Sequence, residues 1–273
     1  MTAAAELTSE RAGGLIDALS AIVVRGCNAI LQHPHASTPR RLKPDGSPVT
    51  AADEAAESIL LEGLASLLPR VPIVTEERAD AATADFHGDF IIVDPLDGTR
   101  EYLAGRDEYT VNLALIRRGS PVAGIVAAPA RSVMWRGVVG SHAERLDLRM
   151  LGLGNTIKTR PWPRTAAVAA VSRSHFDSAT DAFLSRLGNI RREPCGSALK
   201  FGLIAEGTVD VYPRLAPTCE WDVAAGHAIV AAAGGALVTP QGAALVYGRA
   251  REKFRVSSFI AWGDASRAKT GAG

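Results

Sequence analysis

The chain has 273 residues, of which 47% are hydrophobic and 22% charged, and its formal net charge is +1. This composition predicts a globular protein with one large core or two joined halves, and it excludes a disordered chain. A charge so close to zero does not indicate a nucleic acid polymer or an anionic membrane as principal partner. Cys27, Cys195 and Cys219 lack the spacing of a zinc site, and their odd number favours a reduced, cytoplasmic protein.

The N-terminal region predicts one surface helix. Four apolar residues between positions 15 and 30 fall near one helical face, which indicates packing by a single stripe. Asp17 and Ser20 interrupt the apolar run, and no basic region of the signal-peptide kind precedes it. No run reaches the roughly 18 apolar residues of a membrane span. We therefore expect no integral membrane segment and a cytoplasmic location, with peripheral association with a membrane left open.

A polar loop from Gln32 to Pro48 leads into a second predicted helix, from Ala51 to about Leu68. Thr50 is a good N-cap for this helix, and Asp53 occupies the capping-box position three residues later. Asp53 taken alone therefore has a structural explanation. A short apolar strand at 71–74 then ends in two acids, Glu76 and Glu77.

The most informative stretch is a buried strand at 91–93 that is followed by acidic residues. We expect Asp94 to end this strand, because Pro95 cannot donate to a sheet ladder and disfavours helix before it. Asp97 then lies three residues on, with the Leu96 carbonyl between the two carboxylates. Hard oxygen ligands gathered in this way suit Mg²⁺. The alternative is an ordinary Asp-Gly turn with Asp94 as a helix cap.

The rest of the chain alternates strands and helices. A hairpin over 110–127, a strand at 133–139 and weak signals over 142–164 complete a first half. A second unit begins with a buried strand at 166–171. We predict a mixed α/β fold whose N-terminal half is 1–160, whose C-terminal half is 161–265, and whose tail at 266–273 is disordered. Further elements are predicted as a helix at 197–204, a strand at 209–212, a helix at 223–233 and a strand at 254–262.

Five acids stand at element boundaries, where their side chains can converge on one crevice. Each has a plain explanation as a helix cap or a solvated loop residue. All five together point instead to a metal-assisted reaction. They are Asp53, Glu76, Asp94, Asp97 and Asp222.

The motif from Asp94 to Thr99 resembles the inositol monophosphatase superfamily of Mg²⁺-dependent, lithium-sensitive phosphatases. Glu76-Glu77 upstream and the stretch from Trp221 to Gly226 downstream carry the same resemblance, which extends from about Leu15 to Trp262. It implies a five-layered αβαβα sandwich of the inositol monophosphatase and fructose-1,6-bisphosphatase type.

The resemblance also implies the metal ligands. Carried over by position, Glu76, Asp94 and the Leu96 carbonyl would hold one Mg²⁺. Asp94, Asp97 and Asp222 would hold a second ion, and Glu76 would also reach a third ion that is bound more weakly.

The same resemblance implies the catalytic residues. Thr99, with Asp53 as its partner, would orient and deprotonate the attacking water. The transferred phosphoryl group would lie on the backbone N–H groups of Gly98 and Thr99.

Within the superfamily, four stretches resemble 3'(2'),5'-bisphosphate nucleotidases of the CysQ type, whose preferred substrate is 3'-phosphoadenosine 5'-phosphate. These stretches are Lys43 with 45–50, 172–175, 196–201 and 212–214. A second phosphate away from the metals needs its own charged donors, although these bases are also compatible with ordinary solvated side chains. The expected substrate-binding residues are Lys43, Gly98, Thr99, Ser174, His175, Ser197, Lys200, Arg214 and Asp222.

We therefore predict an enzyme that removes the 3'-phosphate from 3'-phosphoadenosine 5'-phosphate, giving AMP and phosphate. This substrate is a by-product of sulfur assimilation. One alternative is an inositol or broad sugar-phosphate phosphatase. Another is a non-catalytic metal- or nucleotide-binding regulator, against which the intact acids and Thr99 argue. The sequence leaves the oligomeric state open.

Overall fold

Strand β4 (Asp89–Asp97) runs through the centre of the fold and carries two of the acids. The structure is a computed structural model that describes residues 7–33, 40–42, 46, 48–150, 154–174 and 177–269. Ile91 and Val93 of β4 face one hydrophobic core, and Phe90 and Ile92 face another. This alternation explains the continuous apolar run, because a strand buried on both faces needs apolar residues at every position.

β4 belongs to a seven-stranded mixed sheet of order β3-β4-β5-β6-β7-β8-β9, in which only the β3–β4 pair is parallel. Arg118 and Gly119, both with positive φ, form the turn of the predicted β5–β6 hairpin. The remaining strands are β3 (Ile73–Thr75), β5 (Thr110–Arg117), β6 (Ser120–Ala128), β7 (Val133–Val138), β8 (Ala143–Asp147) and β9 (Asn155–Ile157).

A second, five-stranded mixed sheet has the order β11-β10-β12-β16-β14. Two further antiparallel pairs flank the sheets, β1 (Arg40–Leu42) with β2 (Pro48–Thr50) and β13 (Thr218–Cys219) with β15 (Arg255–Val256). The strands of the second sheet are β10 (Ala167–Ser172), β11 (Ile190–Cys195), β12 (Val211–Arg214), β14 (Ala236–Val238) and β16 (Phe259–Trp262).

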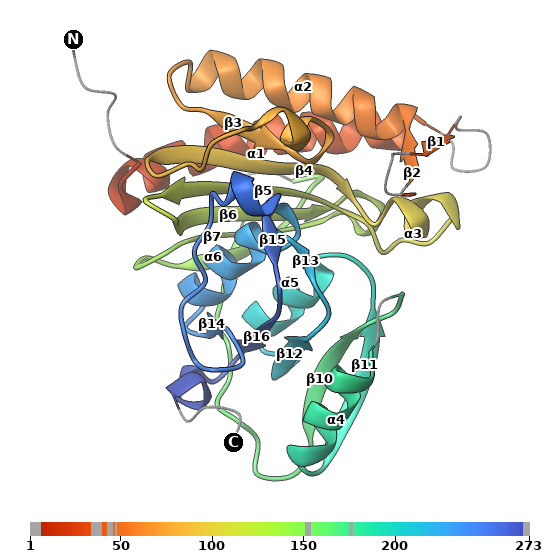
Figure 1. Cartoon of the computed structure of the whole chain (residues 1–273), viewed down its shortest axis with the longest axis vertical. Coiled ribbons are helices and arrows are strands. Elements are labelled where there is room, and N and C mark those ends of the chain that lie inside the picture. The colour runs from red at the N-terminus through yellow and green to blue at the C-terminus, as the bar shows by residue number, and fades with distance from the viewer. Residues whose placement is uncertain are drawn as a thin grey trace.

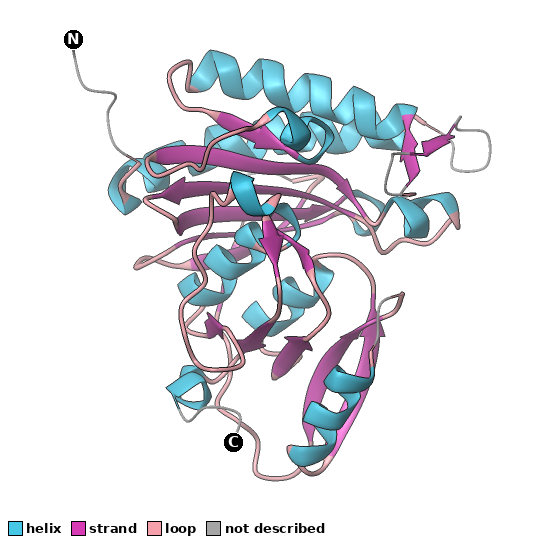
Figure 2. Ribbon diagram, viewed as in Figure 1, coloured by secondary structure: helices cyan, strands magenta, loops and turns pink. Residues whose placement is uncertain are grey.

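The helices complete the layers, as Figures 1 and 2 show. Helices α1 (Ser9–Leu31) and α2 (Ala51–Leu67) pack on the outer face of the large sheet. Helices α5 (Leu199–Ala205) and α6 (Ala224–Ala232) lie between the two sheets, and α4 (Ser178–Arg186) covers the far side of the small one. The predicted mixed α/β class and the αβαβα order are therefore confirmed.

Helix α1 is long and apolar enough to cross a membrane, judged by length and composition alone. In this fold it packs against α2 and β6 instead, and its Leu19, Val23 and Ile30 side chains are fully buried. Its apolar composition thus has an explanation in the core of the fold.

The middle layer comes very close to the large sheet. A Cβ atom at Gly124 of β6 would lie 2.3 Å from the Ala225 carbonyl oxygen of α6. Within the middle layer, a Cβ atom at Gly226 of α6 would lie 2.1 Å from the Phe201 ring of α5. Both positions therefore require glycine. This close packing fixes the start of α6, which follows directly after Asp222.

Some predicted elements differ from the structure. β4 does not end at Asp94 but continues through Pro95 to Asp97, because an irregularity in its pairing accommodates the proline. The predicted strand over 254–262 is divided into β15 and β16. The weak region at 142–164 holds β8 and β9, while α4 and β11 were not predicted. Residues 266–269 of the expected tail lie in the 3₁₀ segment Ala265–Lys269, and 270–273 lie outside the described residues.

Candidate active site

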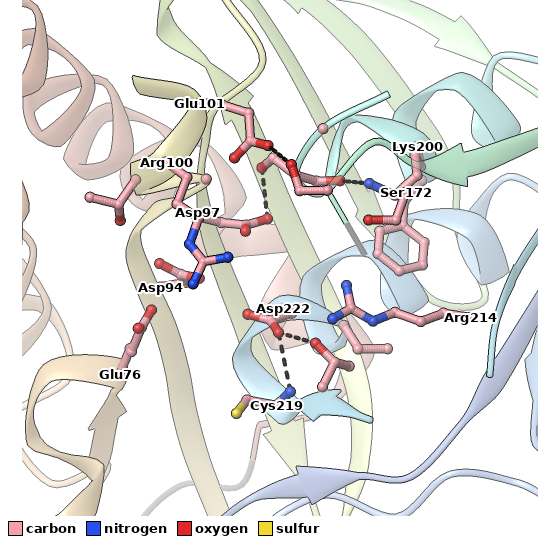
Figure 3. Close-up of a pocket in the computed structure, with 18 of the residues that line it drawn as sticks. Glu76, Asp94, Asp97, Arg100, Glu101, Ser172, Lys200, Arg214, Cys219 and Asp222 are labelled. Carbon is pink, nitrogen blue, oxygen red and sulfur yellow. Dashed lines mark hydrogen bonds between the residues drawn. The ribbon is translucent and has the colours of Figure 1, made fainter. Parts of the chain in front are cut away.

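A cavity of about 310 Å³ lies where the C-terminal end of β4 meets the loops of the second half (Figure 3). Asp53 does not line it but lies buried behind Thr99. Lys43 and His175 fall outside the residues that the structure describes. The other predicted site residues all line the cavity: Glu76, Asp94, Leu96, Asp97, Gly98, Thr99, Ser174, Ser197, Lys200, Arg214 and Asp222.

An irregularity in β4 brings Asp94 and Asp97 to the same edge. Asp94 pairs with Asn112 and Asp97 with Thr110, so β4 advances three residues while β5 advances two. In a regular strand, residues three apart point to opposite faces, and the extra residue of a bulge restores them to one face. The register shift is therefore what places the Asp94 and Asp97 carboxylates on the same face of β4.

Asp222 joins this pair from the other half of the molecule. One oxygen each from Asp94, Asp97 and Asp222 lie within 4.8 Å of one another. The sequence predicted that Asp222 begins a helix. In the structure Asp222 is instead the last residue of the 3₁₀ turn η4 (Glu220–Asp222), which precedes that helix. Its carboxylate accepts hydrogen bonds from the Thr218 hydroxyl and from the Cys219 backbone N–H at 3.1 Å.

The electrostatics of the cluster favour a cation. Burial, followed by the negative charge of Asp97, raises the pKa of Asp222 above its ordinary value. Glu76, the first residue of η2 (Glu76–Ala81), lines the same cavity. Crowded carboxylate oxygens of this kind fit a hard divalent metal ion, which relieves their mutual repulsion.

Thr99 and Asp53 form a second unit beside the cluster. The Thr99 Oγ1 lies 3.1 Å from Asp53 Oδ1 and 3.2 Å from the Leu96 carbonyl oxygen. Asp53 Oδ2 accepts from the Thr50 backbone N–H at 2.8 Å and from the Thr50 hydroxyl at 2.6 Å. The predicted capping box is confirmed, and burial raises the pKa of Asp53. One carboxylate thus both caps α2 and holds the Thr99 hydroxyl.

Ser197 reaches the acids from the loop before α5. It adopts a positive φ of 50°, and its hydroxyl donates to Asp97 Oδ2 at 2.6 Å. The same hydroxyl contacts Thr110 Oγ1, a residue that the sequence did not single out. Ser197 therefore fixes the orientation of Asp97 across the two halves.

Lys200 is only 2% exposed, although it lines the cavity. Its Nζ donates to the carbonyl oxygens of Ser197 and, at 3.1 Å, of Cys195, and it lies 5.0 Å from the centre of the Tyr212 ring. Two of its three N–H donors are thus engaged in holding the strained loop that presents Ser197.

Arg214, by contrast, has an N–H donor without a hydrogen-bond partner among the described residues. Its Nη2 donates to the Pro217 carbonyl at 3.4 Å, while its buried Nε has no hydrogen-bond partner within the described part of the chain. Burial opposes its charged form, but interactions with Tyr212, Asp222 and Asp97 outweigh this, so the pKa of Arg214 lies above its ordinary value. Figure 3 shows its guanidinium pointing towards Asp222.

Two glutamates that the sequence analysis missed hold the rim of the site. Glu101 accepts a hydrogen bond from Ser174. Glu108 pairs with Arg173 at 2.7 Å and accepts from the Gly196 backbone N–H at 2.9 Å. The sequence gives no local signal for either glutamate, because the residues that they bind come from the other half of the molecule.

Comparisons with known proteins show the family of this chain. The profile described as the inositol monophosphatase family matches residues 14–262. The 3'(2'),5'-bisphosphate nucleotidase CysQ of Salmonella typhimurium is 43% identical over 192 residues, which cover 70% of this chain and 76% of that protein. The Buchnera aphidicola protein of the same name is 37% identical over 80% of this chain and 82% of its own length.

A solved structure also matches. The crystal structure of CysQ from Bacteroides thetaiotaomicron, a bacterial member of the inositol monophosphatase family, is 30% identical and superposes with a TM-score of 0.74. The match covers 94% of this chain and 98% of that one. This chain therefore belongs to the inositol monophosphatase family, whose enzymes are metal-dependent phosphatases.

Proposed function

We propose that this chain is a Mg²⁺-dependent 3'(2'),5'-bisphosphate nucleotidase that removes the 3'-phosphate from 3'-phosphoadenosine 5'-phosphate. The observation that carries the proposal is the arrangement of the cavity, in which three convergent carboxylates adjoin an arginine with an unused donor. The similarity to proteins named 3'(2'),5'-bisphosphate nucleotidase CysQ, at 37% to 43% identity, supports this substrate class.

The acids divide into two overlapping sets of ligands. Glu76, Asp94 and the Leu96 carbonyl would hold one Mg²⁺, and Asp94, Asp97 and Asp222 a second, with a third ion near Glu76 at most weakly held. When bound, these ions supply Lewis acidity that activates water and stabilises the charge developing on the leaving oxygen.

Thr99 and Asp53 handle the proton of the attacking water. The Thr99 hydroxyl donates to Asp53 Oδ1, which leaves its own lone pairs facing the cavity to accept a proton from water. Asp53 is held by Thr50, so the hydroxyl is oriented before substrate arrives. The pair therefore acts on the reacting water and not on the remainder of the substrate.

We assign to Arg214 the binding of the second phosphate of the substrate. Arg214 is a half-buried arginine of the described cavity lining whose buried Nε–H is unused, and a charge-assisted hydrogen bond to phosphate would satisfy that donor. Ser197 orients Asp97 through its hydrogen bond, and Lys200 supports the loop of Ser197 through hydrogen bonds to its backbone carbonyl oxygens. Ser174 and the backbone of Gly98 lie on the same cavity wall and complete the substrate surface.

The test is phosphate release with Mg²⁺ from four substrates measured side by side. They are 3'-phosphoadenosine 5'-phosphate, adenosine 3'-monophosphate, inositol 1-phosphate and fructose 1,6-bisphosphate. We expect the nucleoside bisphosphate to give the highest kcat/KM and the monophosphate a clearly lower one. A preference for inositol 1-phosphate or the sugar bisphosphate would overturn the proposed substrate and favour the broader phosphatase.

A further inference from the structure

Arg100 is a residue of the cavity that neither the metal ligands nor the water-orienting pair accounts for. It follows Thr99 in α3 (Thr99–Leu103), and its side chain is exposed and lines the cavity. In the view of Figure 3 its guanidinium projects from α3 across Asp97 and Asp94 and towards the side on which Asp222 lies. A full positive charge thus lines the same cavity as the acid cluster.

No residue in the described part of the chain engages the guanidinium of Arg100. Within the described ranges it has no ion pair with a carboxylate, although several carboxylates line the same cavity. Arg173, on the rim of the same site, shows the usual alternative, since its guanidinium pairs with Glu108 through two hydrogen bonds at 2.7 and 2.8 Å. Arg100 therefore keeps its planar set of N–H donors available to a ligand.

A phosphoryl group is the ligand that suits such donors. A guanidinium presents several N–H groups in one plane and binds phosphate oxygens in pairs. A divalent cation in the acid cluster and the Arg100 guanidinium would repel each other. An anion bound between them would be attracted to both and would relieve this repulsion. The attachment of Arg100 directly after Thr99 puts it at the reacting end of the cavity.

We propose that Arg100 binds the phosphoryl group that is transferred, while Arg214 binds the second phosphate. This inference rests on the proposed function. Both arginines line the cavity, and in the view of Figure 3 their guanidinium groups lie on opposite sides of Asp222. In the reaction, the water oxygen bonds to phosphorus as the bond from phosphorus to the 3'-oxygen breaks. The water's proton passes to the Thr99–Asp53 pair, the 3'-oxygen takes a proton from solvent, and Arg100 neither gains nor loses one.

The proposal predicts that Arg100→Gln weakens phosphate binding without weakening Mg²⁺ binding. Loss of the guanidinium weakens the binding of phosphate, because charge-assisted hydrogen bonds are lost. It leaves Mg²⁺ binding by the substrate-free protein unchanged or makes it tighter, because a positive charge beside the carboxylates is removed. A residue with a merely structural role would weaken both.

The experiment compares Arg100→Gln with Arg106→Gln, which removes the same charge from an exposed position just beyond α3 that does not line the cavity. For Arg100→Gln we expect kcat/KM to fall about 10- to 100-fold, the range of one hydrogen bond to a charged group, on both 3'-phosphoadenosine 5'-phosphate and adenosine 3'-monophosphate. Inorganic phosphate should bind the Mg²⁺-loaded variant correspondingly more weakly in calorimetry. Arg106→Gln should match the wild type in every measurement.

Three results would overturn the assignment. A loss confined to the bisphosphate would move Arg100 to the second phosphate. Weakened Mg²⁺ binding together with weakened phosphate binding would make its role structural, and wild-type behaviour would make it an ordinary solvated arginine. If the wild type prefers another phosphate monoester, the proposed function fails, but the same comparison on that ester still decides the role of Arg100.

Discussion

The two halves of the molecule deliver their acids to the site by different means. Asp94 and Asp97 stand on a nine-residue strand whose central residues are buried on both faces. Asp222 stands on a three-residue 3₁₀ turn between the two-stranded β13–β15 pair and α6. The first pair is therefore fixed by the core itself. Asp222 depends on the packing of α6 against β6, so we expect the second half to be the more easily disturbed.

The largest effect is expected at the rigid side of the site. Asp94→Asn should reduce kcat to background and abolish tight Mg²⁺ binding, because Asp94 is assigned to both ions. The metal-free protein should unfold at the same or a higher urea concentration, since one of three crowded charges is removed. Activity close to that of the wild type would contradict the assignment of shared ligands.

Thr99→Ala tests the neighbouring unit on the same side. We expect kcat to fall by about 100-fold or more, the lower end for loss of proton transfer, with little change in KM. The hydroxyl acts on water and not on bound substrate, which is why the two constants should separate. An effect on KM alone would mean that Thr99 only binds phosphate.

Acid should destabilise the C-terminal half of the molecule through His227. Burial lowers the pKa of His227, in α6, from an ordinary 6.5 to about 4, so below pH 6.5 the unfolded chain binds a proton that the folded chain excludes. Stability should therefore fall between about pH 6.5 and pH 4, by up to about 3 kcal/mol for a shift of this size. Urea unfolding at several pH values measures the slope. His227→Asn should flatten this part of the profile, and an unchanged slope would assign it to other groups.

Arg214→Ala and Lys200→Met separate substrate binding from the support of Asp97. Arg214→Ala should cost about 1.5–3 kcal/mol in kcat/KM on the bisphosphate and little on adenosine 3'-monophosphate, the value for a hydrogen bond to a charged group. Lys200→Met should lower kcat on both substrates, because Lys200 holds the loop of Ser197. If both variants lost the same kcat/KM on both substrates, Arg214 and Lys200 could not be assigned different roles.

Gly124→Ala tests the contact on which Asp222 depends. The new methyl group would meet the Ala225 carbonyl, so α6 must shift, with a cost in unfolding free energy of about 1–3 kcal/mol. Mg²⁺ affinity should weaken as Asp222 moves. The matched control is Gly13→Ala, on an exposed stretch of α1 with nothing near the added atom, which should be slightly stabilising. A stable Gly124→Ala with wild-type Mg²⁺ affinity would show that α6 does not position Asp222.

The sequence predicted best what is encoded locally. The buried run before Asp94 and the capping box of Thr50 and Asp53 both depend on neighbours in the chain, and both are present. The register shift in β4 was not predictable, because it is a relation between two strands. The surroundings of Lys200 were equally hidden: its carbonyl partners are close in sequence, but its burial arises from the packing of the second half. Short polar strands such as β8 and β11 were missed because their apolar pattern is weak.

The irregular pairing of β4 has a consequence for how the chain tolerates changes in length. Deleting one residue between Asp94 and Asp97 would give a regular ladder with β5, and the sheet could close around it. The two carboxylates, then two positions apart, would still share one face, but the extra residue that sets the Leu96 carbonyl between them would be lost. A deletion here would therefore preserve a folded protein with both carboxylates on one face, and its Mg²⁺ affinity would measure the contribution of the Leu96 carbonyl. In surface loops, by contrast, a change of one residue should leave the site intact.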